Sequence, residues 1–200
     1  GSTMSDAIGG ISALLSPLVD ALRRYVLAPG KLHGDDVPVP VLSPGKGSTK
    51  TGRLWVYVRD NRPAGDMAAP AVWFAYSPDR KGAHPQAHLE NFTGILQADA
   101  FSGYGPLYQS GEIIEAACMA HARRKFHDLH VEHASPITTE ALRRIGELYV
   151  IEGEIRGKLP NVRRAVRQEQ AKLLFDAMHD WPHESLGKLS AKSETTKAIR

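Results

Sequence analysis

Two aspartates beside strand-like segments are the residues of this 200-residue chain whose type and position best suit chemistry. Asp35 precedes the Val- and Pro-rich segment 37–42, and Asp99 directly follows the apolar segment 94–98. Mg²⁺ prefers a few carboxylates together with water and substrate phosphate, so carboxylates at strand ends can hold divalent metal for phosphoryl transfer. Asp36 is an alternative to Asp35, because adjacent strand residues point to opposite faces and only one of them can face the site.

A sheet is the element expected to position these acids. Three extended segments are rich in Val, Trp, Tyr and Phe and are separated by Gly, Pro, Ser and Asn, which predicts an antiparallel meander. Aromatic residues within strands are more often core than stacking platforms for bases, so Trp55 and Trp73 are expected in the core. The three expected strands are residues 37–42, 53–60 and 71–76.

A short helix and a buried strand are expected to lead to Asp99, over residues 84–92 and 94–98. A turn with a brief helix and then a fifth strand follow, over residues 101–108 and 112–117. The order of three strands, a helix and a strand matches the start of an RNase H-like sheet, although composition alone also allows other α/β arrangements. The expected fold class is α/β (α+β), a mixed sheet with flanking helices and a C-terminal helical region, for which an RNase H-like sheet is one arrangement.

Helical patterns flank the sheet segments. Ser16-Pro17 is typical of an N-cap and a first helical position, and Pro29-Gly30 is expected to stop the helix that begins there. Beyond the fifth strand the sequence turns helical, and we expect Pro136 to begin one helix and Trp181-Pro182 to end another. A further helix is expected over residues 190–200.

Three longer motifs surround these segments: Pro44 to Tyr57, Tyr76 to Gly82 and Cys118 to Phe126. They resemble the catalytic core of bacterial insertion-sequence-66 transposases, and the resemblance runs from about Leu14 to the C-terminus. It implies a DDE transposase, in which two aspartates and a glutamate on an RNase H-like fold hold two Mg²⁺ or Mn²⁺ ions to cut and rejoin DNA. The implied partners are transposon-end DNA, target DNA and other transposase protomers, with no membrane, in the bacterial cytoplasm at the nucleoid.

By this resemblance, Asp35 is the first catalytic and metal-binding aspartate, with Asp36 as its alternative, and Asp99 is the second. The family's third acid lies in an Asn-Asn-x-x-Glu-Arg stretch, which does not occur before Arg200. We therefore interpret the chain as a truncated core that is inactive as it stands and whose complete protein would be a polynucleotidyl transferase. The alternative is a non-catalytic DNA-binding or protein-interaction remnant of a transposase.

The expected domain boundaries follow from the same comparison. Residues 1–4 resemble an expression scar, residues 5–118 a partial RNase H-like core, and residues 119–200 a helical insertion that ends before the third acid. With 42% hydrophobic and 24% charged residues, the composition is ordinary for a globular protein. No run approaches the roughly 20 apolar residues of a membrane span.

Basic residues indicate where DNA would bind. The net charge of +3 says little about a polyanionic partner, but local basic groups can contact phosphates and supply sequence-independent affinity. A plain solvated surface is the alternative for each group. The stretch 45–52 lacks the spacing of a Walker loop and is expected to be a hairpin loop. The expected DNA contacts are Lys46, Lys50 and Arg53 and, near the active-site rim by resemblance, His121, Arg123 and Arg124.

The single cysteine, Cys118, excludes an internal disulfide. Together with His121 it begins a series of possible zinc ligands that continues with His127, His130 and His133. These residues lack the paired Cys-x-x-Cys spacing that marks a zinc site, so zinc is the weaker interpretation.

Overall fold

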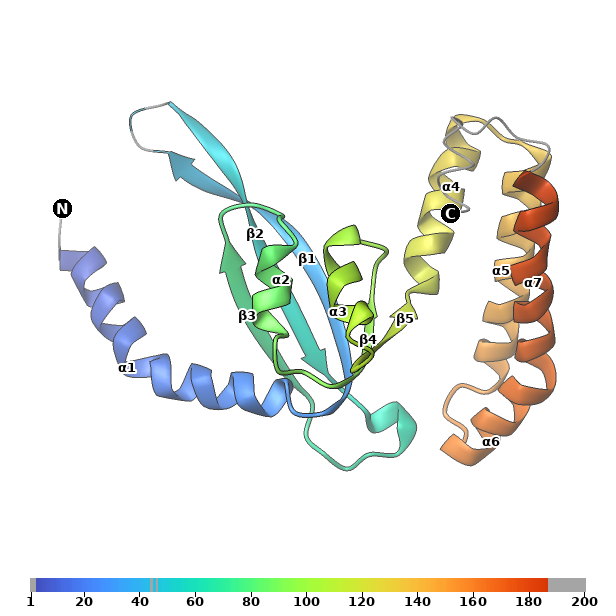
Figure 1. Ribbon diagram of the computed structural model, residues 1–200, viewed down its shortest axis with the longest axis horizontal. Coiled ribbons are helices and arrows are strands. Elements are labelled where there is room, and N and C mark those ends of the chain that lie inside the picture. Colours follow the sequence, from blue (N-terminus) through green and yellow to red (C-terminus); the bar gives the residue numbers. More distant parts are fainter. Residues whose placement is uncertain (1–2, 44, 46, 187–200) are drawn as a thin grey trace. The chain divides into compact units, whose positions relative to one another are not determined.

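The computed structural model describes residues 3–43, 45 and 47–186. The chain divides into two compact units, Gly1–Ala117 and Cys118–Arg200. The sequence predicts a boundary after residue 118. The first unit carries a sheet and the second is helical (Figure 1). In the part of the chain that the structure describes, no helix is long and apolar enough to cross a membrane.

The first unit is built on a five-stranded sheet with the strand order β3-β2-β1-β4-β5. Strands β1 to β3 are antiparallel, which confirms the expected meander, whereas β4 and β5 run parallel to β1. The mixed α/β class is therefore confirmed. The strands are β1 Gly30–Ser43, β2 Ser48–Arg59, β3 Ala71–Ser77, β4 Gly94–Ala98 and β5 Ile113–Ala117.

Strand β1 is longer than the sequence predicts, because it begins at Gly30 and not at residue 37. Its first residues pair in parallel with β4, and a partner so distant in the chain cannot be recognised from a local pattern. Asp35 and Asp36 consequently lie within the strand, paired with residues of β2, and not before it.

Residues 39–43 of β1 and 48–52 of β2 form a two-stranded ribbon that extends beyond the sheet (Figure 1). β3 pairs only with residues 53–59 of β2, and β4 only with residues 30–33 of β1, so no other described strand joins the ribbon. The expected loop over 45–52 is shorter in the structure, because β1 continues to Ser43 and β2 begins at Ser48.

One face of the sheet carries the core of the first unit. Trp55 and Trp73 are buried there, as predicted, and His88 contacts both rings from helix α2, Ala83–His88. A 3-10 turn, Ser102–Tyr104, and helix α3, Gly105–Gln109, contribute further side chains and confirm the expected brief helix after Asp99. The buried core residues are Val26, Leu32, Trp55, Tyr57, Trp73, Leu89, Phe92, Leu96, Ala98, Tyr104 and Ile113.

The opposite face of the sheet is open among the described residues. Phe74 and Tyr76 of β3 are 54% and 53% exposed, and Ile114 of β5 is 61% exposed. Asp35 belongs to this face, because it pairs with Val56, which in turn pairs with Phe74.

Helix α1, Thr3–Val26, corrects the expected start at Ser16. The apolar spacing continues N-terminal to Pro17, and Pro17 lies inside the helix. A proline removes one backbone hydrogen-bond donor, and here the helical turns before and after Pro17 keep their own hydrogen bonds, so the helix continues. Met4 and Leu14, in the N-terminal half, are exposed, whereas Val26 reaches the core of the sheet unit.

The second unit is a helical hairpin with an added helix. Ser135 caps its middle helix in a capping box with Thr138, and the expected start at Pro136 is confirmed. Phe126, Ala141 and Ile145 form its buried centre. The elements are α4 Met119–Glu132, α5 Pro136–Glu154, α6 Pro160–Val166, a π-helical turn Arg167–Ala171 and α7 Lys172–Leu186.

The expected helix end at Trp181-Pro182 is wrong, since α7 runs through to Leu186. Trp181 packs against the centre of the unit and the Arg144 guanidinium lies 5.2 Å from its ring centroid, so tertiary contacts outweigh the breaker. The helix expected over residues 190–200 lies outside the described residues.

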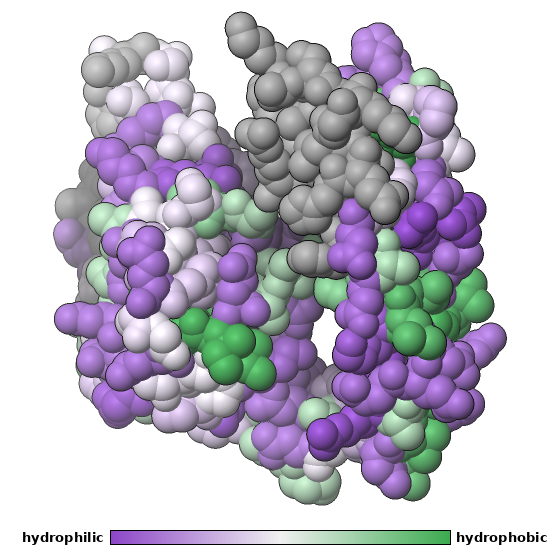
Figure 2. Space-filling view, turned by 45° about the vertical axis from the view of Figure 1, so that its right-hand side comes forward, coloured by the Kyte–Doolittle hydropathy of each residue, from purple (hydrophilic) through white to green (hydrophobic). Residues whose placement is uncertain are grey.

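Hydrophilic residues make up most of the face seen in Figure 2, with separate apolar patches between them.

Candidate functional site

The two neighbouring aspartates of β1 have opposite surroundings. Strand alternation places Asp36 on the core face with Leu32 and Gly34, and its side chain is only 2% exposed. Asp35 is exposed on the open face. Its Oδ1 accepts the backbone N–H of Asp36 at 2.8 Å, and the described residues give this carboxylate no other hydrogen bond.

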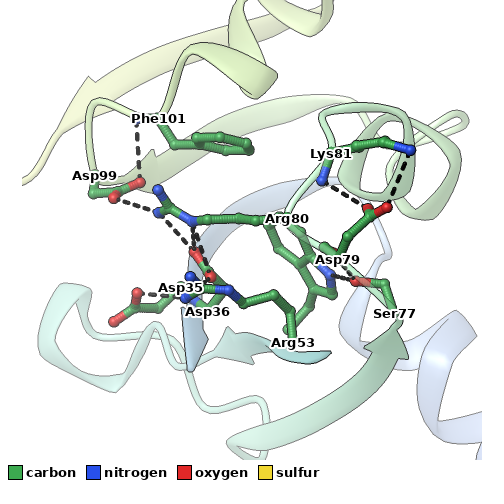
Figure 3. A network of polar contacts seen from close by, with 10 residues as sticks. Asp35, Asp36, Arg53, Ser77, Asp79, Arg80, Lys81, Asp99 and Phe101 are labelled. Carbon is green, nitrogen blue, oxygen red and sulfur yellow. Dashed lines mark hydrogen bonds and ion pairs between the residues drawn. The ribbon is translucent and has the colours of Figure 1, made fainter. Parts of the chain in front are cut away.

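Asp99 directly follows β4, and its backbone position corresponds to that of Asp35 in β1. The parallel pairing of β1 with β4 ends at His33 and Gln97, and each aspartate follows two residues later. The Asp99 side chain is 23% exposed, and its Oδ1 accepts the backbone N–H of Phe101 at 3.2 Å. The backbone positions of Asp35 and Asp99 therefore correspond, and both carboxylates have access to solvent. The Asp99 carboxylate lies beside that of Asp36, with which it shares Arg80, whereas the Asp35 carboxylate belongs to the open face (Figure 3).

A guanidinium that the sequence did not single out joins the buried acid to Asp99 (Figure 3). Arg80 Nη2 lies 2.7 Å from Asp36 Oδ1 and 3.0 Å from Asp99 Oδ2. Arg80 Nε also donates to both oxygens of Asp36, at 2.9 and 3.0 Å. Hydrogen bonding to Asp36, more than that to Asp99, raises the pKa of Arg80. Three distant segments thus meet at one charged side chain.

A second guanidinium completes the surroundings of Asp36. Arg53 of β2 donates from Nη1 to Asp36 Oδ2 at 3.0 Å. A buried carboxylate is tolerated only when charge and hydrogen bonds compensate its lost hydration, and Arg53 and Arg80 supply both. Asp36 is therefore saturated by arginine donors, whereas Asp35 is not.

The loop after β3 holds Arg80 in place. Ser77, 1% exposed, accepts the indole N–H of Trp55 at 2.8 Å and donates to the Asp79 carbonyl at 2.6 Å. The Asp79 carboxylate accepts the backbone N–H of Lys81 at 3.1 Å, and this bond is the main cause of its lowered pKa. The Phe101 ring centroid lies 4.2 Å from the Arg80 guanidinium carbon.

Tyr104 is another residue near the acids that the sequence analysis missed. Its hydroxyl is buried and has no hydrogen-bond partner among the described residues. Burial raises its pKa well above the usual range, and the charges of Asp99 and Asp36 raise it further. A polar atom left unpaired beside carboxylates is what a site that takes up water or a hydrated ion presents. Of the two residues that the sequence analysis missed, Arg80 lies within a motif of the resembled family, Tyr76 to Gly82, and Tyr104 lies in none of the three motifs.

The donor chemistry fits a hard divalent cation. Asp35 and Asp99 offer carboxylate oxygens with solvent access, which Mg²⁺ and Mn²⁺ accept together with water and phosphate. Within the described residues, no group of three or more His, Cys, Asp or Glu side chains is placed to hold a metal, which leaves the zinc interpretation without a site. Two acids would form an incomplete metal site.

The predicted DNA contacts fall in different places. Lys50 is exposed on the ribbon opposite Val41, whereas Arg53 is engaged by Asp36. Lys46 lies outside the described residues. The remaining three belong to α4 in the helical unit, where His121 is half-buried and the two arginines are exposed: His121, Arg123 and Arg124.

Comparison with known proteins identifies the family. Over 99% of its length, the chain is 41% identical to the uncharacterized protein y4hP of Sinorhizobium fredii, and over 100% it is 35% identical to y4qI of the same strain. A third protein of that strain, y4jD, is 32% identical over 93% of the chain. The chain spans 38% of the length of each of these relatives. The sequence profile of the transposase IS66 family matches residues 1–200, so the chain belongs to the IS66 family of transposases.

Proposed function

We propose that the chain forms part of a transposase catalytic core that cuts and rejoins DNA with divalent metal ions, and that Asp35 and Asp99 are two of its metal ligands. The observation that carries the proposal is the corresponding backbone position of these aspartates, one within β1 and one directly after the parallel strand β4, with both carboxylates open to solvent. Family membership supports transposition as the process.

The surroundings of the neighbouring aspartates favour Asp35 over Asp36 as the first ligand. A metal ion needs lone pairs that are not already used, and a carboxylate has about four lone-pair sites in all. Asp36 receives Arg53 and Arg80 and is almost fully buried. Asp35 uses one oxygen for one backbone N–H.

In this reaction the bound metal would activate the attacking water or 3′-hydroxyl and stabilise the leaving oxygen. Asp35 and Asp99 would hold this ion, Mg²⁺ or Mn²⁺, through carboxylate oxygens. A third acid would complete the site. Other protomers of the transposase would be needed to pair two transposon ends.

DNA would contact the ribbon of β1 and β2. A two-stranded ribbon is narrow enough to enter a major groove, and Lys50 is exposed on it. Arg53 would hold the buried Asp36 instead, because Asp36 already engages it. Lys46 and the α4 residues His121, Arg123 and Arg124 remain proposed phosphate contacts.

The test is strand cleavage by the longer protein that contains this chain, with DNA carrying the element's ends and Mn²⁺. Asp35→Asn and Asp99→Asn should each abolish cleavage and leave DNA binding intact. Asp66→Asn is the matched control, since Asp66 is an exposed aspartate of a loop in the same unit. Cleavage retained by either site variant removes that residue from the mechanism. A wild-type protein that binds DNA and never cuts it would be a non-catalytic remnant.

A further inference from the structure

We propose that Arg80 is a positioning residue that fixes the Asp99 carboxylate for metal binding, with Asp36 as the buried anchor that holds Arg80. The inference rests on the proposed function of Asp35 and Asp99. It assigns roles to two residues, Arg80 and Asp36, that the proposed reaction does not itself use.

The geometry separates an anchoring side of the guanidinium from a positioning side. Nε and Nη2 of Arg80 form a fork on Asp36, and Nη2 alone reaches on to Asp99 Oδ2. A planar guanidinium presents its donors in fixed directions, so the fork on Asp36 determines where Nη2 lies. Asp99 is thereby held at one oxygen by Arg80 and at the other by the Phe101 backbone.

Asp36 suits an anchor because it does not move easily. Its side chain is 2% exposed, and Arg53 holds its second oxygen. The residues before and after Asp36 in β1 are paired with β2, which fixes the backbone of the acid. Arg80 is steadied in turn by the Phe101 ring and by the Ser77 hydrogen bonds of its loop (Figure 3).

Asp99 can bind a metal while Arg80 holds it. A carboxylate has about four lone-pair sites, and Arg80 and Phe101 use one each. Hydrogen bonds to a ligating carboxylate orient it, and their loss typically costs about 10- to 100-fold in metal affinity. A guanidinium that merely competed for the carboxylate would act in the opposite sense, because its removal would strengthen cation binding.

The experiment measures the affinity of the protein for Mn²⁺ by electron paramagnetic resonance, without DNA and without turnover. Arg80→Gln should weaken Mn²⁺ binding about tenfold or more. Arg80→Lys should weaken it too, although the charge remains, because an ammonium has no fork to reach both acids. The matched control is Arg62→Gln, which removes a guanidinium that is 62% exposed and pairs with Asp60.

The outcomes are distinguishable. Tighter Mn²⁺ binding by Arg80→Gln, or wild-type binding by Arg80→Lys, overturns the positioning role. If Asp35→Asn and Asp99→Asn keep wild-type Mn²⁺ affinity, the proposed metal site itself fails, whatever Arg80 does. Should Arg80→Gln fold poorly, the thermal unfolding of Arg80→Lys shows whether that variant is folded, and its affinity decides the question.

Discussion

Asp35→Asn and Asp36→Asn are chemically identical changes at adjacent residues, yet the structure predicts very different costs. The Asp36 side chain is 2% exposed and engages Arg53 and Arg80, whose side chains are 25% and 36% exposed. Breaking a fully buried pair typically costs about 3–5 kcal/mol. Because the arginines retain contact with water, we expect Asp36→Asn to lower the free energy of unfolding by about 2–3 kcal/mol.

Asp35→Asn should cost about 0.5 kcal/mol or less, since Asp35 is exposed and an asparagine oxygen can still accept the backbone N–H of residue 36. The assay is urea unfolding followed by tryptophan fluorescence in a Trp181→Phe background. The two remaining tryptophans, Trp55 and Trp73, both lie in the core of the sheet unit and report on it alone. Equal costs for the two variants, or a larger cost at Asp35, would refute the assignment of Asp36 as the buried anchor.

Three further changes test the packing around the site. Ser77→Ala should destabilise the protein by about 1–3 kcal/mol, because the buried indole N–H of Trp55 loses its acceptor; a double-mutant cycle with Trp55→Phe should show coupling, and additive costs would exclude the bond. Burial lowers the pKa of His88 to about 4, so the unfolded state binds its proton first and stability should fall as pH drops from 6.5 towards 4. After allowance for partial exposure we expect about 1–2 kcal/mol, and urea titrations at several pH values should give a shallower fall for His88→Gln. Gly94→Ala should prevent stable folding by circular dichroism, since a Cβ would lie 2.1 Å from the Gly30 carbonyl oxygen at a φ of +126°; a native thermal transition would contradict this.

Local sequence patterns predicted the strands whose residues are apolar or aromatic and are bounded by turn-forming residues. They missed strand residues that are held only by pairing with a segment distant in the chain. β3 and β4 appear where expected, because their apolar residues are bounded by turn-forming residues. The start of β1 escaped prediction, since residues 30–33 are held by parallel pairing with β4. Pro17 misplaced the start of α1 for a related reason, because a breaker is read locally and a helix is stabilised over its whole length.

The site divides in the same way. Asp35 and Asp99 were recognisable because they lie beside strand-like segments, and the structure keeps both at solvent-accessible positions. The burial of Asp36 and the contacts of Arg80 with Asp36 and Asp99 could not be read from the sequence. They depend on which face of β1 each aspartate occupies and on a loop that meets two distant segments, and both arise only in the assembled sheet.

The most direct measurement of the central claim is a crystal structure of the protein soaked in Mn²⁺, with the ion located by its anomalous scattering. We predict an ion with oxygens of both Asp35 and Asp99 within about 2.0 to 2.6 Å, and with Arg80 still bridging Asp36 and Asp99. An ion ligated by Asp36 with Arg80 displaced, or aspartates that bind no common ion, would contradict the account.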